Sequence, residues 1–350
     1  MSGADGVNVD VSPSAYTQLA GTGLEVSPLC LGTAAFSYEG GPDWTIRDRE
    51  QSLTVLERAF EAGINFVDTA NIYGGGESEE LVGEAIDGRR EDLVVASKVG
   101  KRTGDGPNER GLSRKAIHRE CEATLDRLGT DYLDLYYIHQ WDPRPPLEEV
   151  LSALDELVSS GRVRYVGASN LTGWQLATAL ERSDCEGYER FVCVQPEYNL
   201  VARHEEENVL PVAADRDLAV CPYAPLAAGF LTGQYDRYTD RSELRDPTDT
   251  YRNLDVYADG SAWDVLEVVS ELAEQKDATP IQVSVAWLLE KDVVTAPIIG
   301  PRTVDHLEEY LGALEISLTD EEISELEAPI EPVWSDRMVN WDWSGEFALR

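Results

Sequence analysis

Residues 93–98 read LVVASK, and this stretch decides how the whole chain is interpreted. Its four apolar residues are consecutive and do not alternate with polar ones, which is typical of a parallel strand covered on both faces. Similar runs recur along the chain. The eight predicted strands are 29–32, 65–68, 93–98, 132–139, 163–168, 191–195, 218–222 and 295–299.

Amphipathic helical patterns alternate with these strands. The predicted helices are 49–62, 78–86, 113–128, 147–160, 173–182, 205–215, 262–276 with 281–291, and 303–311. Eight strand–helix units without a linker predict an α/β fold, one (β/α)8 TIM barrel. A doubly wound sheet is the competing architecture, but the segment after Leu31 lacks the G-x-G-x-x-G of its dinucleotide-binding form. The Walker pattern is missing as well.

Several segments extend this minimal barrel. We expect residues 1–15 to be a loose leader, 16–330 to be a single barrel that begins with a β-hairpin around 20–23, and 331–350 to be an extended, Trp-rich C-terminal tail. The polar stretch 233–260 is too long for an ordinary loop. Such segments are usually lids, binding loops or disorder.

The charge of the chain is its most unusual property. Among 350 residues, 29 Lys and Arg face 66 Asp and Glu, a formal net charge of −37. This excludes a nucleic-acid binder that works through a basic face, and it disfavours an anionic membrane surface as partner. Because molar salt screens such a coat, the composition favours a halophile. An acidic mesophilic protein, or one that docks a basic partner, is the alternative.

Cysteine and histidine usage indicates neither a disulfide framework nor a metal centre. The five cysteines are odd in number, widely spaced and free of C-x-x-C, so we expect reduced core thiols. The four histidines are scattered, and no metal is expected. The N-terminus lacks the pattern of a signal peptide, and no apolar run reaches the length of a membrane span. We therefore expect a cytoplasmic protein.

Ionisable residues follow three neighbouring predicted strands at the point where each strand ends. Asp68 ends the second strand, and Tyr73 follows in the same loop. Lys98 ends the third strand and His139 the fourth. In a barrel the carboxyl ends of the strands carry the reactive groups, so we expect these four side chains to meet at the mouth.

The four residue types make chemical sense together. Tyrosine has an unperturbed pKa near 10, which is too high for efficient proton transfer at neutral pH. A nearby ammonium from Lys98 would stabilise the phenolate of Tyr73, and Asp68 would keep that ammonium charged. Neutral His139 could hydrogen-bond a substrate carbonyl oxygen. The set predicts a general acid beside an oxyanion site.

The motif around these residues is similar to that of a known family. The run NFVDTANIYG at 65–74, with the later Ser97-Lys98 and Ile138-His139, resembles the aldo-keto reductase superfamily, in the branch of bacterial reductases and potassium-channel β subunits. The similarity runs from about residue 16 to about residue 327. It implies an enzyme in which Tyr73 donates the proton, while NAD(P)H delivers hydride to an aldehyde or ketone.

The resemblance also implies residues for the nicotinamide end of the cofactor. Ser169 and Asn170 after the fifth strand, with Gln195 after the sixth, correspond to the clamp on the carboxamide. Tyr223, just past the seventh strand, corresponds to the aromatic that stacks on the ring. An amide group needs both donors and acceptors, which this set supplies.

Two further segments resemble the phosphate-binding parts of the family. The run 223–233, with Leu226 and Gly229, corresponds to the pyrophosphate loop, with Ala224 where a serine is frequent. The run 298–310 joins a glycine turn to a helix start, where free N–H groups favour phosphate. Its implied cofactor residues are Gly300, Arg302, His306 and Glu309.

Arg302 could fork onto a 2′-phosphate, so NADP(H) is favoured over NAD(H). His306 stands where the family often has Gln, and Tyr310 stands where Asn commonly helps to hold adenine. Phe36, Trp44 and Trp141 are candidates for an aromatic substrate pocket, as are some tail tryptophans. Core packing is an equal alternative for each.

The expected activity is NAD(P)-dependent reduction of an aldehyde or ketone, or oxidation of the alcohol. A redox-sensing subunit that holds NADP(H) with little turnover is the second hypothesis. A barrel hydrolase or aldolase is the third, with Lys98 as the one candidate for a Schiff base. The sequence predicts a small-molecule substrate and leaves its identity and the oligomeric state open.

Overall fold

The structure, a computed structural model, describes residues 10–12, 15–39, 45–240, 244, 254, 257 and 260–330. Its centre is a sheet of eight strands in the order β10-β3-β4-β5-β6-β7-β8-β9, and each neighbouring pair in this order is parallel. The strands are β3 (Cys30–Gly32), β4 (Phe66–Asp68), β5 (Val94–Val99), β6 (Leu133–Ile138), β7 (Val163–Ser169), β8 (Phe191–Gln195), β9 (Ala219–Val220) and β10 (Ile298–Ile299).

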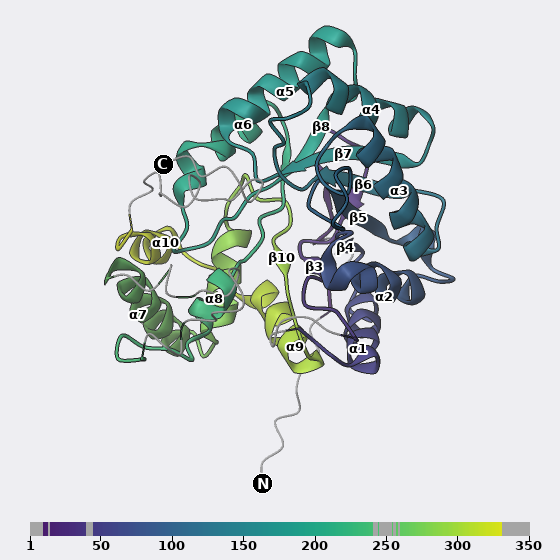
Figure 1. Cartoon of the computed structure of the whole chain (residues 1–350). Helices are drawn as coiled ribbons and strands as arrows, with labels where there is room; N and C mark the ends of the chain where they lie inside the picture. The colour runs from purple at the N-terminus through teal and green to yellow at the C-terminus, as the bar shows by residue number, and fades with distance from the viewer. Residues whose placement is uncertain are drawn as a thin grey trace.

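Backbone hydrogen bonds also join the two strands at the ends of this order. The Thr295 N–H donates to the Val220 carbonyl and the Ile298 N–H to the Pro222 carbonyl, each at 2.8 Å. Figure 1 shows the sheet curled at the centre with helices around it. The arrangement is consistent with the predicted (β/α)8 barrel, and each of the eight predicted strands overlaps an observed one.

Helices follow the strands along the chain. They are α1 (Arg49–Glu61), α2 (Glu77–Ala85), α3 (Arg114–Leu128), α4 (Leu147–Ser159), α5 (Gly173–Glu186), α6 (Val209–Asp215), α7 (Gly260–Gln275), α8 (Pro280–Leu289), α9 (Val304–Leu311) and α10 (Asp320–Glu327). Short 3-10 turns add η2 (Tyr73–Gly76), η3 (Arg90–Asp92), η4 (His204–Glu207), η5 (Ala227–Thr232) and η7 (Gly312–Glu315). Side-chain caps mark several starts, among them Asp48 for α1, Ser113 for α3 and Thr279 for α8.

Helix α10 was not among the predicted helices. Its eight residues bury one side chain, Leu326, so the apolar periodicity that reveals a helix is weak there. The signal that could have revealed it is the capping box formed by Thr319 and Glu322.

The predicted N-terminal hairpin is confirmed. Strands β1 (Thr17–Gln18) and β2 (Glu25–Val26) pair antiparallel and form a separate two-stranded sheet. Most of the predicted leader and all of the predicted tail, 331–350, lie outside the described residues. Within the long segment 233–260, Leu244, Leu254 and Tyr257 are described and buried.

Side chains on β5 alternate between two separate cores. On β5, Val94 and Ala96 belong to a small cluster inside the sheet, whereas Val95 and Val99 join the large cluster between sheet and helices. Burial on both faces explains why the apolar runs do not alternate in the sequence. The alternation also decides which residue at each strand end faces the interior.

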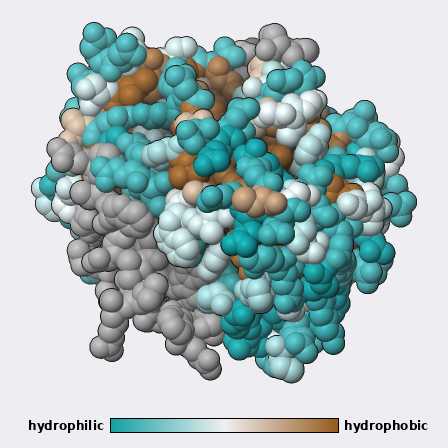
Figure 2. Space-filling model, turned by 90° about the horizontal axis from the view of Figure 1, so that it is seen from above, coloured by the Kyte–Doolittle hydropathy of each residue, from teal (hydrophilic) through white to brown (hydrophobic). Residues whose placement is uncertain are grey.

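No helix in the described part of the chain is long and apolar enough to span a membrane. On the face shown in Figure 2, hydrophilic residues predominate and hydrophobic patches lie between them.

Candidate active site

Strand alternation places the predicted polar residues on one inward-facing ring. Asp68 lies two residues after Phe66, Lys98 two after Ala96, and His139 two after Tyr137. Phe66, Ala96 and Tyr137 belong to the cluster inside the sheet. Because side chains two apart on a strand share a face, Asp68, Lys98 and His139 continue that interior at its carboxyl end. The same spacing relates Gly167 to Ser169, Cys193 to Gln195 and Cys221 to Tyr223.

Lys98 is the centre of the predicted catalytic set. Its side chain is completely buried and forms an ion pair with Asp68. Its Nζ also donates to the Thr69 carbonyl at 2.9 Å and to the Tyr73 hydroxyl oxygen at 3.2 Å. The ammonium lies 4.8 Å from the centre of the Tyr73 ring. The structure therefore places the phenol, the ammonium and the carboxylate within one hydrogen-bonded group.

Burial and charge act in opposite directions on the Lys98–Asp68 pair. Burial alone would lower the pKa of Lys98, but the nearby Asp68 carboxylate raises it above its ordinary value. Burial also raises the pKa of Asp68, while Lys98 and a hydrogen bond from Gln195 oppose the rise. Lys98 therefore remains an ammonium beside the phenol.

His139 faces the Tyr73 ring from the neighbouring strand end. The two ring centres are 6.0 Å apart, and the planes stand nearly perpendicular at 88°. Burial lowers the pKa of His139 well below its usual value, and the charges of Lys101 and Lys98 act in the same direction. Its buried Nδ1 has no hydrogen-bond partner among the described residues. Burial and the two nearby ammonium groups thus favour the neutral imidazole of His139.

The predicted nicotinamide residues are connected to this group by hydrogen bonds. Asn170 Nδ2 donates to the His139 carbonyl at 2.9 Å, and the Tyr223 hydroxyl donates to Asn170 Oδ1 at 2.8 Å. Ser169 Oγ donates to the Gln195 carbonyl at 2.9 Å. Gln195 Nε2 in turn donates to Asp68 Oδ2 at 2.9 Å. Asn170 Nδ2 also donates to Ser169 Oγ at 2.9 Å, so the two amides, Asn170 and Gln195, belong to one network with the Asp68 carboxylate.

The predicted pyrophosphate loop has an unusual backbone. Ala224, Ala227 and Ala228 have positive φ angles of 54°, 50° and 56°, and Gly229 follows at 103°. Non-glycine residues rarely adopt this region, and such strain is commonly stored at functional sites. Leu226, also in this loop, is buried.

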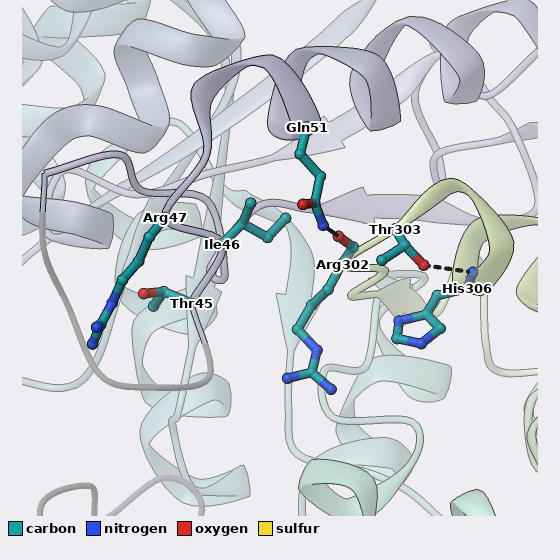
Figure 3. A pocket seen from close by; sticks show the side chains of 7 residues that line it. All are labelled: Thr45, Ile46, Arg47, Gln51, Arg302, Thr303 and His306. Atoms are coloured by element: carbon teal, nitrogen blue, oxygen red, sulfur yellow. Dashed lines mark hydrogen bonds between the residues drawn. The ribbon is translucent and has the colours of Figure 1, made fainter.

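A pocket of about 360 Å³ lies at the rim, where the loop before α1 meets the start of α9. Figure 3 shows Arg302 and His306 on one side of it and Thr45 and Arg47 on the other, with both guanidinium groups toward the same side of the view. Gln51 Nε2 donates to the Arg302 carbonyl at 2.6 Å. The Thr303 Oγ1 caps α9 by accepting from the His306 N–H at 3.1 Å.

The predicted cofactor residues of the run 298–310 lie in different environments. Arg302 and His306 line the pocket, while Glu309 lies further along α9 and is not part of the lining. Gly300 is exposed, and a Cβ added to it would meet no atom within 4 Å. Tyr310 is buried, which raises its pKa, and its hydroxyl contacts the Gly300 backbone.

Comparison with known proteins identifies the family. The sequence profile described as the aldo/keto reductase family matches residues 28–331. This chain belongs to the aldo/keto reductase family. It is 34% identical over 341 residues to the versiconal hemiacetal acetate reductase of Aspergillus parasiticus, covering 91% of this chain and 97% of that protein.

Two more relatives show the same extent of similarity. An uncharacterized oxidoreductase of Bacillus subtilis is 38% identical over 318 residues, which cover 87% of this chain and 93% of the relative. Norsolorinic acid reductase B of Aspergillus parasiticus is 33% identical over 329 residues, with 91% and 85% covered. These similarities support an oxidoreductase.

The aromatic residues near the mouth of this aldo/keto reductase have separate environments. Phe36 is completely buried in the large core, so packing accounts for it and it offers no surface to a substrate. Trp141, two residues after His139, contacts Trp174 on α5 with ring centres 6.1 Å apart. Trp174 is 63% exposed. Trp44 lies outside the described residues.

Several residues of this site were not among the predicted ones. Thr45, Arg47 and Gln51 line the rim pocket but lie in a loop and at the start of a helix, where no strand period points to them. Trp174 could have been singled out as a large apolar residue at a helix start after a strand end. In the described part of this aldo/keto reductase, no group of three or more His, Cys, Asp or Glu is arranged to hold a metal ion.

Proposed function

We propose that this aldo/keto reductase transfers hydride between a bound nicotinamide and a small carbonyl compound, with Tyr73 as the general acid. The observation that carries the proposal is the 3.2 Å contact between Lys98 Nζ and the Tyr73 hydroxyl in a buried site. A positive charge at that distance favours the ionised form of a phenol and so assists proton release.

Each group has a role in reduction. The nicotinamide, when bound, supplies the hydride to the carbonyl carbon. Tyr73 donates its proton to the carbonyl oxygen as that carbon is reduced, and Lys98 stabilises the resulting phenolate. Neutral His139 donates a hydrogen bond to the same oxygen and thereby orients the substrate. In alcohol oxidation the phenolate accepts the proton.

The chain's donor set fits a dinucleotide cofactor with a phosphate at its adenosine end. Two guanidinium groups, Arg47 and Arg302, line the rim pocket beside the start of α9, where free N–H groups favour anions. The amides of Asn170 and Gln195 supply donors and acceptors for a carboxamide at the mouth. NADP(H) is therefore proposed over NAD(H).

The substrate proposed is an aromatic carbonyl compound. The half-buried Trp141, two residues after His139, and the exposed Trp174 form an aromatic surface. Planar rings stack on such surfaces, whereas an aliphatic chain gains contact area alone.

The charge of the chain supports a cell interior of high ionic strength. A formal net charge of −37 repels itself in dilute buffer, and molar salt reduces the Debye length to about 3 Å. We propose a cytoplasmic protein of a halophile, and any assay is therefore run in both dilute and molar KCl.

The proposed activity is tested by mixing the purified protein with NADPH or NADH and a panel of aldehydes and ketones. Continuous loss of the absorbance of reduced nicotinamide over many turnovers is expected. A single stoichiometric event without turnover would support the alternative, a redox-sensing subunit. No oxidation with any member of the panel in either salt would contradict both.

A further inference from the structure

Tyr73 stands at the start of a segment with unusual backbone freedom. Gly74, Gly75 and Gly76 follow it directly, with positive φ angles of 56°, 68° and 110°. Glycine populates this region readily and loses more conformational freedom on folding than any other residue. Three glycines in a row therefore give the phenol a mobile support unless the chain is held again immediately beyond them.

The chain is held again at the first turn of α2. Ser78 is completely buried, and its Oγ lies 2.7 Å from Thr33 Oγ1 and 2.9 Å from Thr69 Oγ1. It also donates to the Thr33 carbonyl at 2.9 Å. Since Thr33 and Thr69 follow β3 and β4, Ser78 holds the start of α2 against two strand ends.

Glu79 connects the same turn to two further elements. Its side chain is completely buried. Oε1 accepts from Ser97 Oγ at 2.5 Å and from Thr124 Oγ1 at 2.9 Å, while Oε2 accepts from Arg127 Nε at 2.6 Å. Ser97 precedes Lys98 on β5, and the other two donors lie on α3. The carboxylate therefore fixes α2 relative to the strand that carries the ammonium.

The packing of α2 against α3 leaves little space for adjustment. A Cβ added to Gly76 would lie 2.9 Å from Arg127 Cδ, and one added to Gly83 would lie 2.7 Å from the Arg127 carbonyl oxygen. One charged and two hydroxyl donors offset the cost of burying the Glu79 carboxylate, and all three reach it only in this arrangement. Movement of the turn would separate Glu79 from its donors.

We propose that the first turn of α2 is a clamp, with Glu79 as its anchor, that holds the Tyr73 phenol at Lys98. The path is short: three glycines and two residues separate Tyr73 from Glu79, whose partner Ser97 is adjacent to Lys98. Glu79 acts through other residues and is a positioning residue, because its described contacts are to Ser97, Thr124 and Arg127. The kinetic test of the clamp, which measures turnover, rests on the proposed function.

Two variants weaken the clamp to different degrees. Glu79→Gln keeps the shape but removes the charge that pairs with Arg127. Ser97→Ala removes the single hydrogen bond toward the Lys98 strand and preserves the ion pair. In both we expect kcat to fall about 10-fold or more, since small displacements of reacting groups have large effects. The pH midpoint of turnover should rise by about 1 unit, because the phenol loses part of its contact with the ammonium.

Matched controls separate positioning from loss of stability. Glu205→Gln changes a carboxylate that is also buried but contacts Asn208 and the Val209 N–H on the η4–α6 segment. Ser183→Ala removes a buried hydroxyl of α5 that donates to the Glu189 carbonyl at 3.1 Å. Both controls should keep the pH midpoint and the kcat of the wild type even if they lower the melting temperature.

Amide hydrogen exchange over residues 73–77 gives a readout that does not require turnover. Exchange there should accelerate about 10-fold in the two clamp variants and stay unchanged in the controls. If the wild type shows no turnover, the proposed function fails, and the exchange rates alone decide on the clamp. If Glu79→Gln does not fold, Ser97→Ala decides. Unchanged pH midpoint and exchange in the clamp variants, or equal changes in the controls, would overturn the proposal.

Discussion

The mouth of the barrel and the pocket at its rim hold their polar groups in different ways. At the mouth, Asp68 and Lys98 are buried, and an ion pair and hydrogen bonds hold both groups within the protein. At the rim, Arg47 is exposed, Arg302 is half-buried, and both face a cavity of about 360 Å³. The polar groups of the mouth are thus held in a buried network of protein contacts, whereas the rim cations lie beside a cavity.

This difference determines what a substitution does in each region. A buried group that loses its partner is left without water to replace it, so changes at the mouth affect both chemistry and stability. The two arginines at the rim are exposed or half-buried, so solvent reaches them. Changes there should affect binding and leave the fold intact.

The largest effect is expected from Tyr73→Phe, which removes the acidic proton of the mouth. We expect kcat for carbonyl reduction to fall about 10²- to 10⁴-fold, the usual contribution of a general acid. The dissociation constant of NADPH, measured by fluorescence titration, should stay within about 2-fold, because the rim pocket is untouched. Tyr132→Phe, before β6, is the control. Equal turnover in Tyr73→Phe and the wild type would remove Tyr73 from its role.

At the rim, Arg302→Ala should weaken NADPH binding about 10- to 100-fold, the range for a lost hydrogen bond to a charged group. NADH, which lacks the 2′-phosphate, should lose far less. Titration of both cofactors against wild type, Arg302→Ala and Arg47→Ala measures the difference. Arg89→Ala, whose cation pairs with Glu57 elsewhere on the surface, is the control. An equal loss for the two cofactors would place the phosphate elsewhere.

The same contrast explains what could be predicted from the sequence. Asp68, Lys98 and His139 each follow an apolar run directly, and the period of two along a strand sets which side chain faces inward. Strand positions, and with them the ring of polar groups, could therefore be predicted without knowledge of any contact. Helix α10 was missed because its apolar face amounts to Leu326.

The residues that line the rim pocket follow no such period in the sequence. Arg302 and Gln51 are hydrogen-bonded although 251 positions separate them in the sequence. The pocket therefore depends on how a loop and a helix start come together in three dimensions. Arg302 was predicted from the family resemblance of the run 298–310, which joins a glycine turn to a helix start. Nothing local points to Arg47 or Gln51. Burial of Phe36 likewise depends on packing from distant segments.

A pH dependence is expected at the mouth because burial lowers the pKa of His139 well below its usual value near 6.5. Below pH 6.5 the unfolded chain binds a proton that the folded protein does not bind. Stability from this residue is therefore complete above pH 6.5 and is lost progressively as the pH falls below it, with a limiting slope of about 1.4 kcal/mol per pH unit.

His139→Asn should flatten this part of the dependence. Urea unfolding at pH 5, 6 and 7.5 gives the free energy of unfolding for each protein. His306→Asn changes a half-buried histidine at the rim and is expected to keep the dependence of the wild type. The same slope in His139→Asn and the wild type would show that the imidazole is not held neutral.

The smallest effect is expected at Trp174, on the border between the two regions. Trp174 is exposed but contacts Trp141 beside the mouth. An aromatic contact contributes about 0.5–1.5 kcal/mol, so Trp174→Ala should raise KM for an aromatic aldehyde about 3- to 10-fold. KM for an aliphatic aldehyde of similar size and kcat for both should change little, because the catalytic set is untouched. Tyr238→Ala, at another exposed aromatic, is the control. A parallel rise for both aldehydes would assign Trp174 to the general shape of the entrance and not to recognition of a ring.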